Sequence, residues 1–311
     1  MTWIPEVASN LAGKVDGVLW VITIISLVFF VLITVVLVYF SIKYRRKRDD
    51  EETPYITGNE ALEVIWTVIP SALLILLFIY GFVVYKDMRT PPADAVEITV
   101  TGKQWLWTFD YYNGKKSINE LYLEQNQPYK MVMRSDDVLH SFFIPGFRVK
   151  QDILPGRYTM LWFTPTKIGT FELFCAEYCG TGHSAMLAKV NVLSPEAYDI
   201  WEKGLQVEGE KVADLPPAEL GEKVYNEKGC NACHSVDGTV LVGPSFKGLM
   251  GETKEFTDGS SSAADENYIR QSILEPQAQV VKGYQPVMPS FKGILSDKEI
   301  DALVAYIKTL N

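Results

Sequence analysis

Residues 175–186 read CAEYCGTGHSAM. Cys175 and Cys179 stand four residues apart, and His183 and Met186 follow them. Thiolate, imidazole and thioether groups are soft or borderline ligands that suit copper. A second stretch, CNACH at 230–234, contains the other two of the four cysteines. Every cysteine of the chain therefore lies in a motif with the ligand types of a metal or haem site.

The first stretch offers more ligands than a mononuclear copper site uses. A blue copper site needs one cysteine, and this stretch has two. A second histidine is also required, and of the three in the chain only His140, in VLHSFFIPG, stands outside both stretches. His140, Cys175, Cys179, His183 and Met186 would complete a two-copper site bridged by both thiolates. Such a site shares one electron over two metals.

The same cysteines allow two other interpretations. Cys175 and Cys179 could form a structural disulfide, which is possible outside the cytoplasm. A zinc site with two cysteines and two histidines is the second interpretation. Neither explains Met186, which has no role in zinc binding. We therefore favour copper.

The CNACH stretch has the C-x-x-C-H pattern of covalent c-type haem attachment. Cys230 and Cys233 would add to the haem vinyl groups, which holds His234 under the iron as proximal ligand. A thioredoxin-like redox pair usually follows a strand in a βαβ unit, whereas this pair follows a predicted helix. A chance match is the remaining alternative. We therefore predict a covalent haem.

Two long runs, 17–40 and 64–85, contain no charged residue. As helices they would measure about 36 and 33 Å, enough to cross the hydrocarbon core of a bilayer. Buried helices of soluble proteins are rarely apolar on all sides over this length. The first run is too long for the core of a signal peptide, and no A-x-A cleavage site follows it. We predict two retained transmembrane spans.

The charges flanking these runs predict their orientation. The segment between them opens with KYRRKR at 43–48, whereas the outer flanks carry only Lys14, Lys86 and Arg89 as basic residues. The positive-inside rule then predicts a cytoplasmic loop, with both termini and everything after about residue 88 outside. The formal net charge of −9 argues against a nucleic-acid partner.

The region 96–193 is rich in β-branched and aromatic residues, interrupted by turn signals such as Asn113-Gly114. Short strands at this spacing predict a sandwich or barrel. A short helix is predicted over 194–205 and a linker over 206–217. The predicted strands are 96–101, 105–112, 129–134, 139–144, 158–163, 170–175 and 186–192.

The residues after the linker predict a helical domain. One helix is expected over 218–229, stopping at Gly229, and another begins at Ser296, which forms a capping-box pattern with Glu299. The predicted organisation is a transmembrane hairpin over 1–93, a β domain over 94–205, the linker, and the helical domain over 218–311.

The helical domain resembles a class I cytochrome c. The resemblance implies that the Pro244 carbonyl accepts a hydrogen bond from His234 and tunes the iron. It also implies that Met288, in VMPSF, is the second axial ligand. Met250 is the rival, and it stands where the family has an apolar packing residue.

The chain from about residue 15 to 205 resembles subunit II of haem–copper cytochrome c oxidases. That resemblance implies a hairpin and an all-β, cupredoxin-like Greek-key barrel with the dinuclear copper centre CuA. The pattern H…C-x-E-x-C-x-x-x-H-x-x-M matches at every position. It implies that Glu177 gives CuA its carbonyl, and that its carboxylate binds Mg or Mn at the border with subunit I. The fused haem domain resembles the caa3 type.

Two further residues take roles from this resemblance. In GKQWLWTFDYY, 102–112, Trp105 matches the tryptophan at which electrons enter CuA, although Leu106 stands where many members have tyrosine. In EALEVIWTVIP, 60–70, Glu63 matches a glutamate at the entrance of the K proton pathway of subunit I, with Glu60 nearby.

The implied function is that of the electron-entry subunit of a caa3-type oxidase in the bacterial plasma membrane, with its metal domains on the periplasmic face. Electrons would pass from a donor cytochrome or upstream respiratory complex through haem c and CuA to subunit I. There, haems and CuB reduce O2 to water with proton translocation. Subunit I and the other oxidase subunits are the implied partners, and the chain holds no oxygen-reducing site because its three histidines are already assigned.

The alternative is the corresponding subunit of a CuA-containing nitric oxide reductase. A copper-delivery or redox-sensing membrane protein is a different class, but it needs an exchangeable site and has no use for a covalent haem. Nitrous oxide reductase is disfavoured because no propeller-length repeat is present. Quinol oxidases are disfavoured because they lack the copper ligands.

Overall fold

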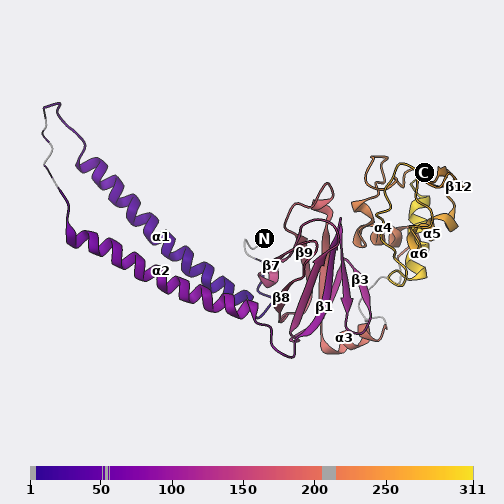
Figure 1. Ribbon diagram of the computed structural model, residues 1–311, viewed down its shortest axis with the longest axis horizontal. Helices are drawn as coiled ribbons and strands as arrows, with labels where there is room; N and C mark the ends of the chain where they lie inside the picture. The colour runs from indigo at the N-terminus through magenta and orange to yellow at the C-terminus, as the bar shows by residue number, and fades with distance from the viewer. Residues whose placement is uncertain (1–4, 51, 53–54, 56, 205–214, 311) are drawn as a thin grey trace. The chain divides into compact units, whose positions relative to one another are not determined.

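The computed structural model describes residues 5–50, 52, 55, 57–204 and 215–310. Its contacts divide the chain into two compact units. One is the helical hairpin, Leu11–Thr90, and the other combines Met1–Asn10 with Pro91–Asn311. The predicted linker, 206–217, falls largely outside the described residues. The order of elements confirms the predicted fold class: two apolar helices, a β domain and a helical domain (Figure 1).

The hairpin consists of α1 (Ala12–Lys43) and α2 (Glu60–Arg89), which contain both predicted spans and extend beyond them. Their most apolar windows are almost entirely exposed. A helix that is apolar on all sides and unburied by protein needs lipid around it. Asn59 caps α2 by accepting a hydrogen bond from the Leu62 N–H. Within this unit, Lys14 of α1 forms an ion pair with Asp87 of α2.

The β domain, hereafter the barrel, consists of two five-stranded sheets (Figure 1). The first has the strand order β3-β2-β1-β5-β8, and the second has the order β4-β10-β9-β6-β7. Most neighbours are antiparallel, but β1 pairs with β5 and β4 with β10 in parallel. The strands are β1 (Val96–Lys103), β2 (Leu106–Tyr111), β3 (Lys116–Ile118), β4 (Glu120–Glu124), β5 (Tyr129–Ser135), β6 (His140–Ile144), β7 (Val149–Ile153), β8 (Thr159–Phe163), β9 (Gly169–Cys175) and β10 (Leu187–Leu193).

Large aromatic side chains fill the space between the sheets. Trp107 packs edge-on against Phe142, and Phe147 packs edge-on against Phe163, with all four side chains fully buried. The short helix α3 (Pro195–Glu202) closes one end of the barrel. These buried rings hold the two sheets in a fixed relation, so that loops at their ends are held in place.

Three of the strands, β3, β4 and β7, are absent from the sequence prediction. The first two are separated only by Asn119, whose backbone is left-handed with φ of 56°. Asparagine tolerates this conformation better than most residues. The third, VKQDI, has a polar centre and lies at the edge of its sheet.

Residues 8–10, assigned to the hairpin by the sequence prediction, instead pair with the barrel. The Asn10 N–H donates to the Thr164 carbonyl over 3.0 Å, and the Thr166 N–H donates to the Ala8 carbonyl over 2.9 Å. Between them, the buried hydroxyl of Ser9 donates to the Phe147 carbonyl over 2.9 Å. We call residues 8–10 the N-terminal strap.

The helical domain contains α4 (Pro217–Glu227), α5 (Glu266–Leu274) and α6 (Asp297–Lys308). Gly221 permits the crossing of α4 and α6, because a Cβ there would lie 2.0 Å from the Ala302 carbonyl oxygen. The predicted capping box of Ser296 and Glu299 is confirmed. A short β-hairpin precedes α5, in which β11 (Thr253–Glu255) pairs with β12 (Ser261–Ala263).

Candidate metal centres

Two neighbouring strands and the loop after them bring the predicted copper ligands together. His140 begins β6, and Cys175 ends β9. These strands are antiparallel, with Phe142 opposite Cys175, so the histidine lies close to the thiol. The loop after β9 then returns through Cys179 to the short 3-10 helix that begins at His183.

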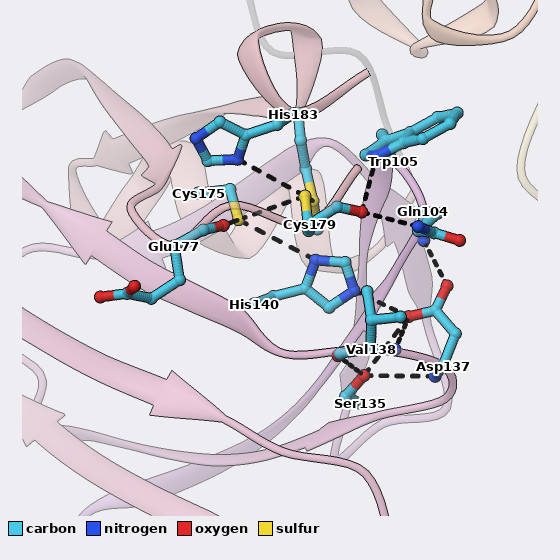
Figure 2. Close-up of polar contacts among 11 residues, drawn as sticks. Gln104, Trp105, Ser135, Asp137, Val138, His140, Cys175, Glu177, Cys179 and His183 are labelled. Atoms are coloured by element: carbon cyan, nitrogen blue, oxygen red, sulfur yellow. Dashed lines mark hydrogen bonds and ion pairs between the residues drawn. The ribbon is translucent and has the colours of Figure 1, made fainter. Parts of the chain in front are cut away.

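The ligand atoms converge on one buried point (Figure 2). The two sulfur atoms of Cys175 and Cys179 are 3.7 Å apart. The Cys175 Sγ is 3.9 Å from the His140 Nδ1, and the Cys179 Sγ is 3.5 Å from the His183 Nδ1. The Cys179 Sγ is also 3.8 Å from the Met186 Sδ. Both cysteines are free thiols, with no disulfide between them.

A backbone carbonyl completes this set of donors. The Glu177 carbonyl oxygen is 3.3 Å from the Cys175 Sγ. Its carboxylate is separate from the sulfur atoms and forms an ion pair with Lys150, whose Nζ is 2.9 Å from the Glu177 Oε1. The same lysine pairs with Asp152 at 2.9 Å. The backbone carbonyl of Glu177 therefore lies beside a candidate copper ligand, whereas its carboxylate contacts Lys150.

Asp137 fixes the orientation of His140. Its Oδ1 is 2.8 Å from the His140 Nε2, which leaves Nδ1 directed at the thiols (Figure 2). The other carboxylate oxygen accepts a hydrogen bond from the Gln104 N–H over 2.7 Å. A carboxylate behind a ligating histidine commonly sets its tautomer and ring orientation. Asp137 is not among the residues selected from the sequence, although it stands only three residues before His140.

The Cys179 carbonyl accepts two side-chain hydrogen bonds. The Gln104 Nε2 donates over 2.6 Å and the Trp105 Nε1 over 3.1 Å (Figure 2). Trp105 also packs against the loop of residues 176–186 that follows β9, hereafter the copper loop. A Cβ on Gly182 in this loop would lie 2.5 Å from the indole ring of Trp105. Trp105, which was selected from the sequence, is thus hydrogen-bonded to the backbone of Cys179, whose thiol is a candidate copper ligand.

The electrostatics of the thiols favour one thiolate in the metal-free protein. Burial opposes ionisation of Cys175, but hydrogen bonds from His140 and from backbone groups lower its pKa below the ordinary value. Burial and the nearby charge of Cys175 raise the pKa of Cys179. Burial lowers the pKa of His140, but hydrogen bonds to Asp137 and Cys175 outweigh it and raise that pKa to about 9. A soft cation that neutralises both thiolates matches this set of donors.

The helical domain brings the predicted haem ligands to one cleft. Cys230 begins a 3-10 turn after α4 and Cys233 follows it, and Met288 lines the same cleft as both cysteines. The His234 Nδ1 is 2.7 Å from the Pro244 carbonyl oxygen, which leaves Nε2 for a metal. Burial lowers the pKa of His234, which favours the neutral imidazole that ligates iron.

The cleft fits a haem by the chemistry of its lining. Two thiols, one imidazole and one thioether face a mostly apolar space. Gly243 is required beside the imidazole, because a Cβ there would lie 2.5 Å from the ring of His234. Both Met288 and Met250 pack against the helical core, but only Met288 lines the cleft.

Glu63 lies in the first turn of α2, as does Glu60. Glu63 directly precedes the predicted second span, 64–85, and its role at a proton pathway stays a prediction. Among the described residues, one group of three or more His, Cys, Asp or Glu side chains lies close enough together to hold a metal ion. It consists of His140, Cys175 and Cys179, all buried.

Comparison with known proteins agrees with this organisation. Residues 2–84 match the transmembrane domain of cytochrome c oxidase subunit II, residues 115–193 match its periplasmic domain, and residues 218–311 match cytochrome c. Cytochrome c oxidase subunit 2 of Alkalihalophilus pseudofirmus is 34% identical over 299 residues, covering 93% of this chain and 84% of the relative. The chain belongs to the cytochrome c oxidase subunit 2 family.

Other relatives match all or part of the chain. Cytochrome c oxidase subunit 2 of Bacillus subtilis is 28% identical over 327 residues, covering 97% of this chain and 90% of the relative. A solved structure of the periplasmic domain of subunit II from Bradyrhizobium japonicum is 30% identical, with a TM-score of 0.36, and covers 37% of this chain and 96% of that one. Within the cytochrome c oxidase subunit 2 family, this chain is a two-span membrane protein with an added cytochrome c domain.

Proposed function

We propose that this chain is the electron-entry subunit of a caa3-type cytochrome c oxidase. The observation that carries the proposal is the convergence of two thiols, two imidazoles, a thioether and a carbonyl in the barrel of a chain that also holds a C-x-x-C-H cleft. Haem c and CuA, when bound, supply one-electron chemistry. Subunit I receives the electron and reduces O2 to water with proton translocation.

Each residue has a defined part in this proposal. Cys230 and Cys233 bind the haem covalently, and His234 and Met288 ligate its iron, with Pro244 holding the histidine. The copper pair is bound by His140, Cys175, Glu177, Cys179, His183 and Met186. Trp105 admits electrons to the copper loop, which its hydrogen bond to the Cys179 carbonyl supports.

Two of the proposed roles concern the border with subunit I. The Glu177 carboxylate is the proposed ligand of Mg or Mn, in exchange for its ion pair with Lys150. Glu63 is the proposed residue at the entrance of the K proton pathway. The basic segment after α1 supports a cytoplasmic loop for the hairpin, with the barrel and the haem domain on the periplasmic face.

Two relatives that match more than nine-tenths of this chain are named cytochrome c oxidase subunit 2. This name supports oxygen as the final electron acceptor. The decisive measurements are metal content and spectra of the full chain, followed by oxygen consumption of the purified complex. Two coppers and one covalent haem are expected per chain. Cys179→Ser should abolish the mixed-valence copper signal and leave the haem spectrum, whereas Ser184→Ala in the same loop should change neither. One copper, or zinc in its place, would contradict the proposal.

A further inference from the structure

The haem cleft is closed on one side by the barrel. Gln104, Trp105 and Leu106, at the junction of β1 and β2, line the same cleft as Cys230 and Met288. Trp105 is only 6% exposed. Its indole therefore lies between the copper loop and the haem cleft, and a protein in solution has almost no access to it.

Apolar side chains of the barrel continue into the core of the haem domain. Leu106 of β2 and Ile118 of β3 belong to the same buried cluster as Leu220 and Val224 of α4. They are 8% and 2% exposed. β3 is an edge strand, and an uncovered apolar edge invites association with other chains. In this structure the haem domain covers it, and burial of apolar surface favours the contact.

A charged pair is buried beside these apolar residues. Lys228, at the C-terminal end of α4, pairs with Glu120, the first residue of β4. Their side chains are 14% and 17% exposed. Exposed ion pairs contribute little because water screens them. A pair withdrawn from water is different, since either charge alone is strongly disfavoured there. The pair therefore selects one position of α4 on the barrel.

The backbone also approaches closely at this contact. Gly229 has a φ of 79°, and a Cβ there would lie 2.5 Å from the Asn119 Nδ2. Asn119 is 3% exposed and is held in place because its Oδ1 accepts a hydrogen bond from the Trp107 N–H over 2.8 Å. Since Gly229 directly precedes Cys230, this fit places the haem attachment point against the barrel.

We propose that Leu106, Ile118, Asn119 and Glu120 form a docking surface for the haem domain of the same chain. With the haem domain docked there, only this domain donates electrons to Trp105. The inference rests on the proposed function for the direction of electron flow. One electron leaves the ferrous haem, which becomes ferric, and the copper pair gains it. No bond breaks and no other reactant is needed. A soluble donor then delivers its electrons to the haem domain and not to Trp105.

The test is a charge-exchange series in the full chain: Glu120→Lys, Lys228→Glu and the double variant. Glu97→Lys, which reverses one partner of the exposed pair with Lys130, is the matched control. The first measurement is the rate constant of haem-to-copper electron transfer after photoreduction of the haem. The second is hydrogen exchange of the segments 115–120 and 227–231, which does not depend on metal chemistry.

Each single reversal should slow the transfer by about tenfold or more, because like charges in a buried pair are disfavoured by at least that factor. It should also remove exchange protection from both segments. The double variant should recover the rate and the protection, and Glu97→Lys should keep both. Single variants that behave like the wild type, or a double variant that does not recover, would overturn the docking surface. Absence of haem or copper from the wild-type chain would refute the proposed function instead, and hydrogen exchange would still decide the docking.

Discussion

Trp105 donates its indole N–H to the backbone carbonyl of Cys179, with 3.1 Å between the two atoms. The Gln104 Nε2 donates to the same carbonyl over 2.6 Å. A residue that lines the haem cleft is thus hydrogen-bonded to a residue that carries a candidate copper ligand. Trp105 therefore borders both candidate sites.

The first prediction concerns that hydrogen bond. Trp105→Phe keeps an aromatic ring in the cleft but removes the donor, so haem-to-copper electron transfer should slow several-fold while the copper spectrum is retained. Flash photoreduction of the haem, followed at the copper absorption band, measures the rate. Trp162→Phe is the control, because Trp162 of β8 is not among the residues that line the cleft. An unchanged rate in Trp105→Phe would remove the indole N–H from the path.

The second prediction concerns Asp137. Asp137→Asn should weaken copper binding by about 10- to 100-fold, because the carboxylate that orients His140 is lost. Competition with a copper chelator measures the affinity. Asp136→Asn is a matched control, since Asp136 is more exposed and is 3.6 Å from an Arg134 nitrogen. If both variants bind copper equally well, Asp137 has no positioning role.

The third prediction separates the two candidate methionines of the haem domain. Met288→Ala should convert a low-spin, six-coordinate haem to a high-spin form or one with a substituted ligand, and should lower its potential. Met250→Ala should leave the ligand field intact, since Met250 does not line the cleft. Absorption spectra and a redox titration distinguish the two. The reverse result would assign Met250 as the ligand.

The fourth prediction is a pH profile set by Lys228. Burial lowers its pKa, but Glu120, Glu299 and Glu227 outweigh this and raise it above the ordinary 10.5. A raised pKa in the folded state means that the ammonium stabilises the docked domain fully below about pH 10 and loses this effect as the pH rises through the folded-state value.

The haem-to-copper rate constant should therefore stay constant from about pH 7 to 10 and fall above that range. Stopped-flow or flash measurements across this range test the expectation. Lys228→Met should transfer electrons more slowly and lose the alkaline fall. A decline in the wild type that begins below about pH 9 would show that another group controls the contact.

Most residues of the two candidate sites can be selected from the sequence because they stand close together in it. The loop from Cys175 to Met186 places three ligand types within a few residues, and C-x-x-C-H is a contiguous motif. His140 was assigned only because the third histidine was already used. Its approach to Cys175 depends on the register of β6 against β9, which no local pattern encodes.

The parts that escaped prediction depend on contacts between distant segments. β3 has only three residues and is stabilised by pairing with β2 and by the cover over Ile118. The pair of Lys228 and Glu120 joins residues 108 positions apart, and each looks like an ordinary surface charge in the sequence. Helix α5 was missed because its apolar stripe is short, although Asp265 was a visible N-cap.

The N-terminal strap has a consequence for biogenesis. Ala8, Ser9 and Asn10 precede the first span in the chain, whereas the barrel residues they pair with follow the second. The barrel can therefore complete its hydrogen bonding only when both flanks of the hairpin have reached the same side of the membrane. A chain that translocates one flank alone would leave the buried Ser9 hydroxyl and the backbone near Thr164 without these partners. Complete folding of the barrel thus requires correct insertion of the hairpin. A fully folded barrel indicates that both flanks of the hairpin lie on the same side of the membrane.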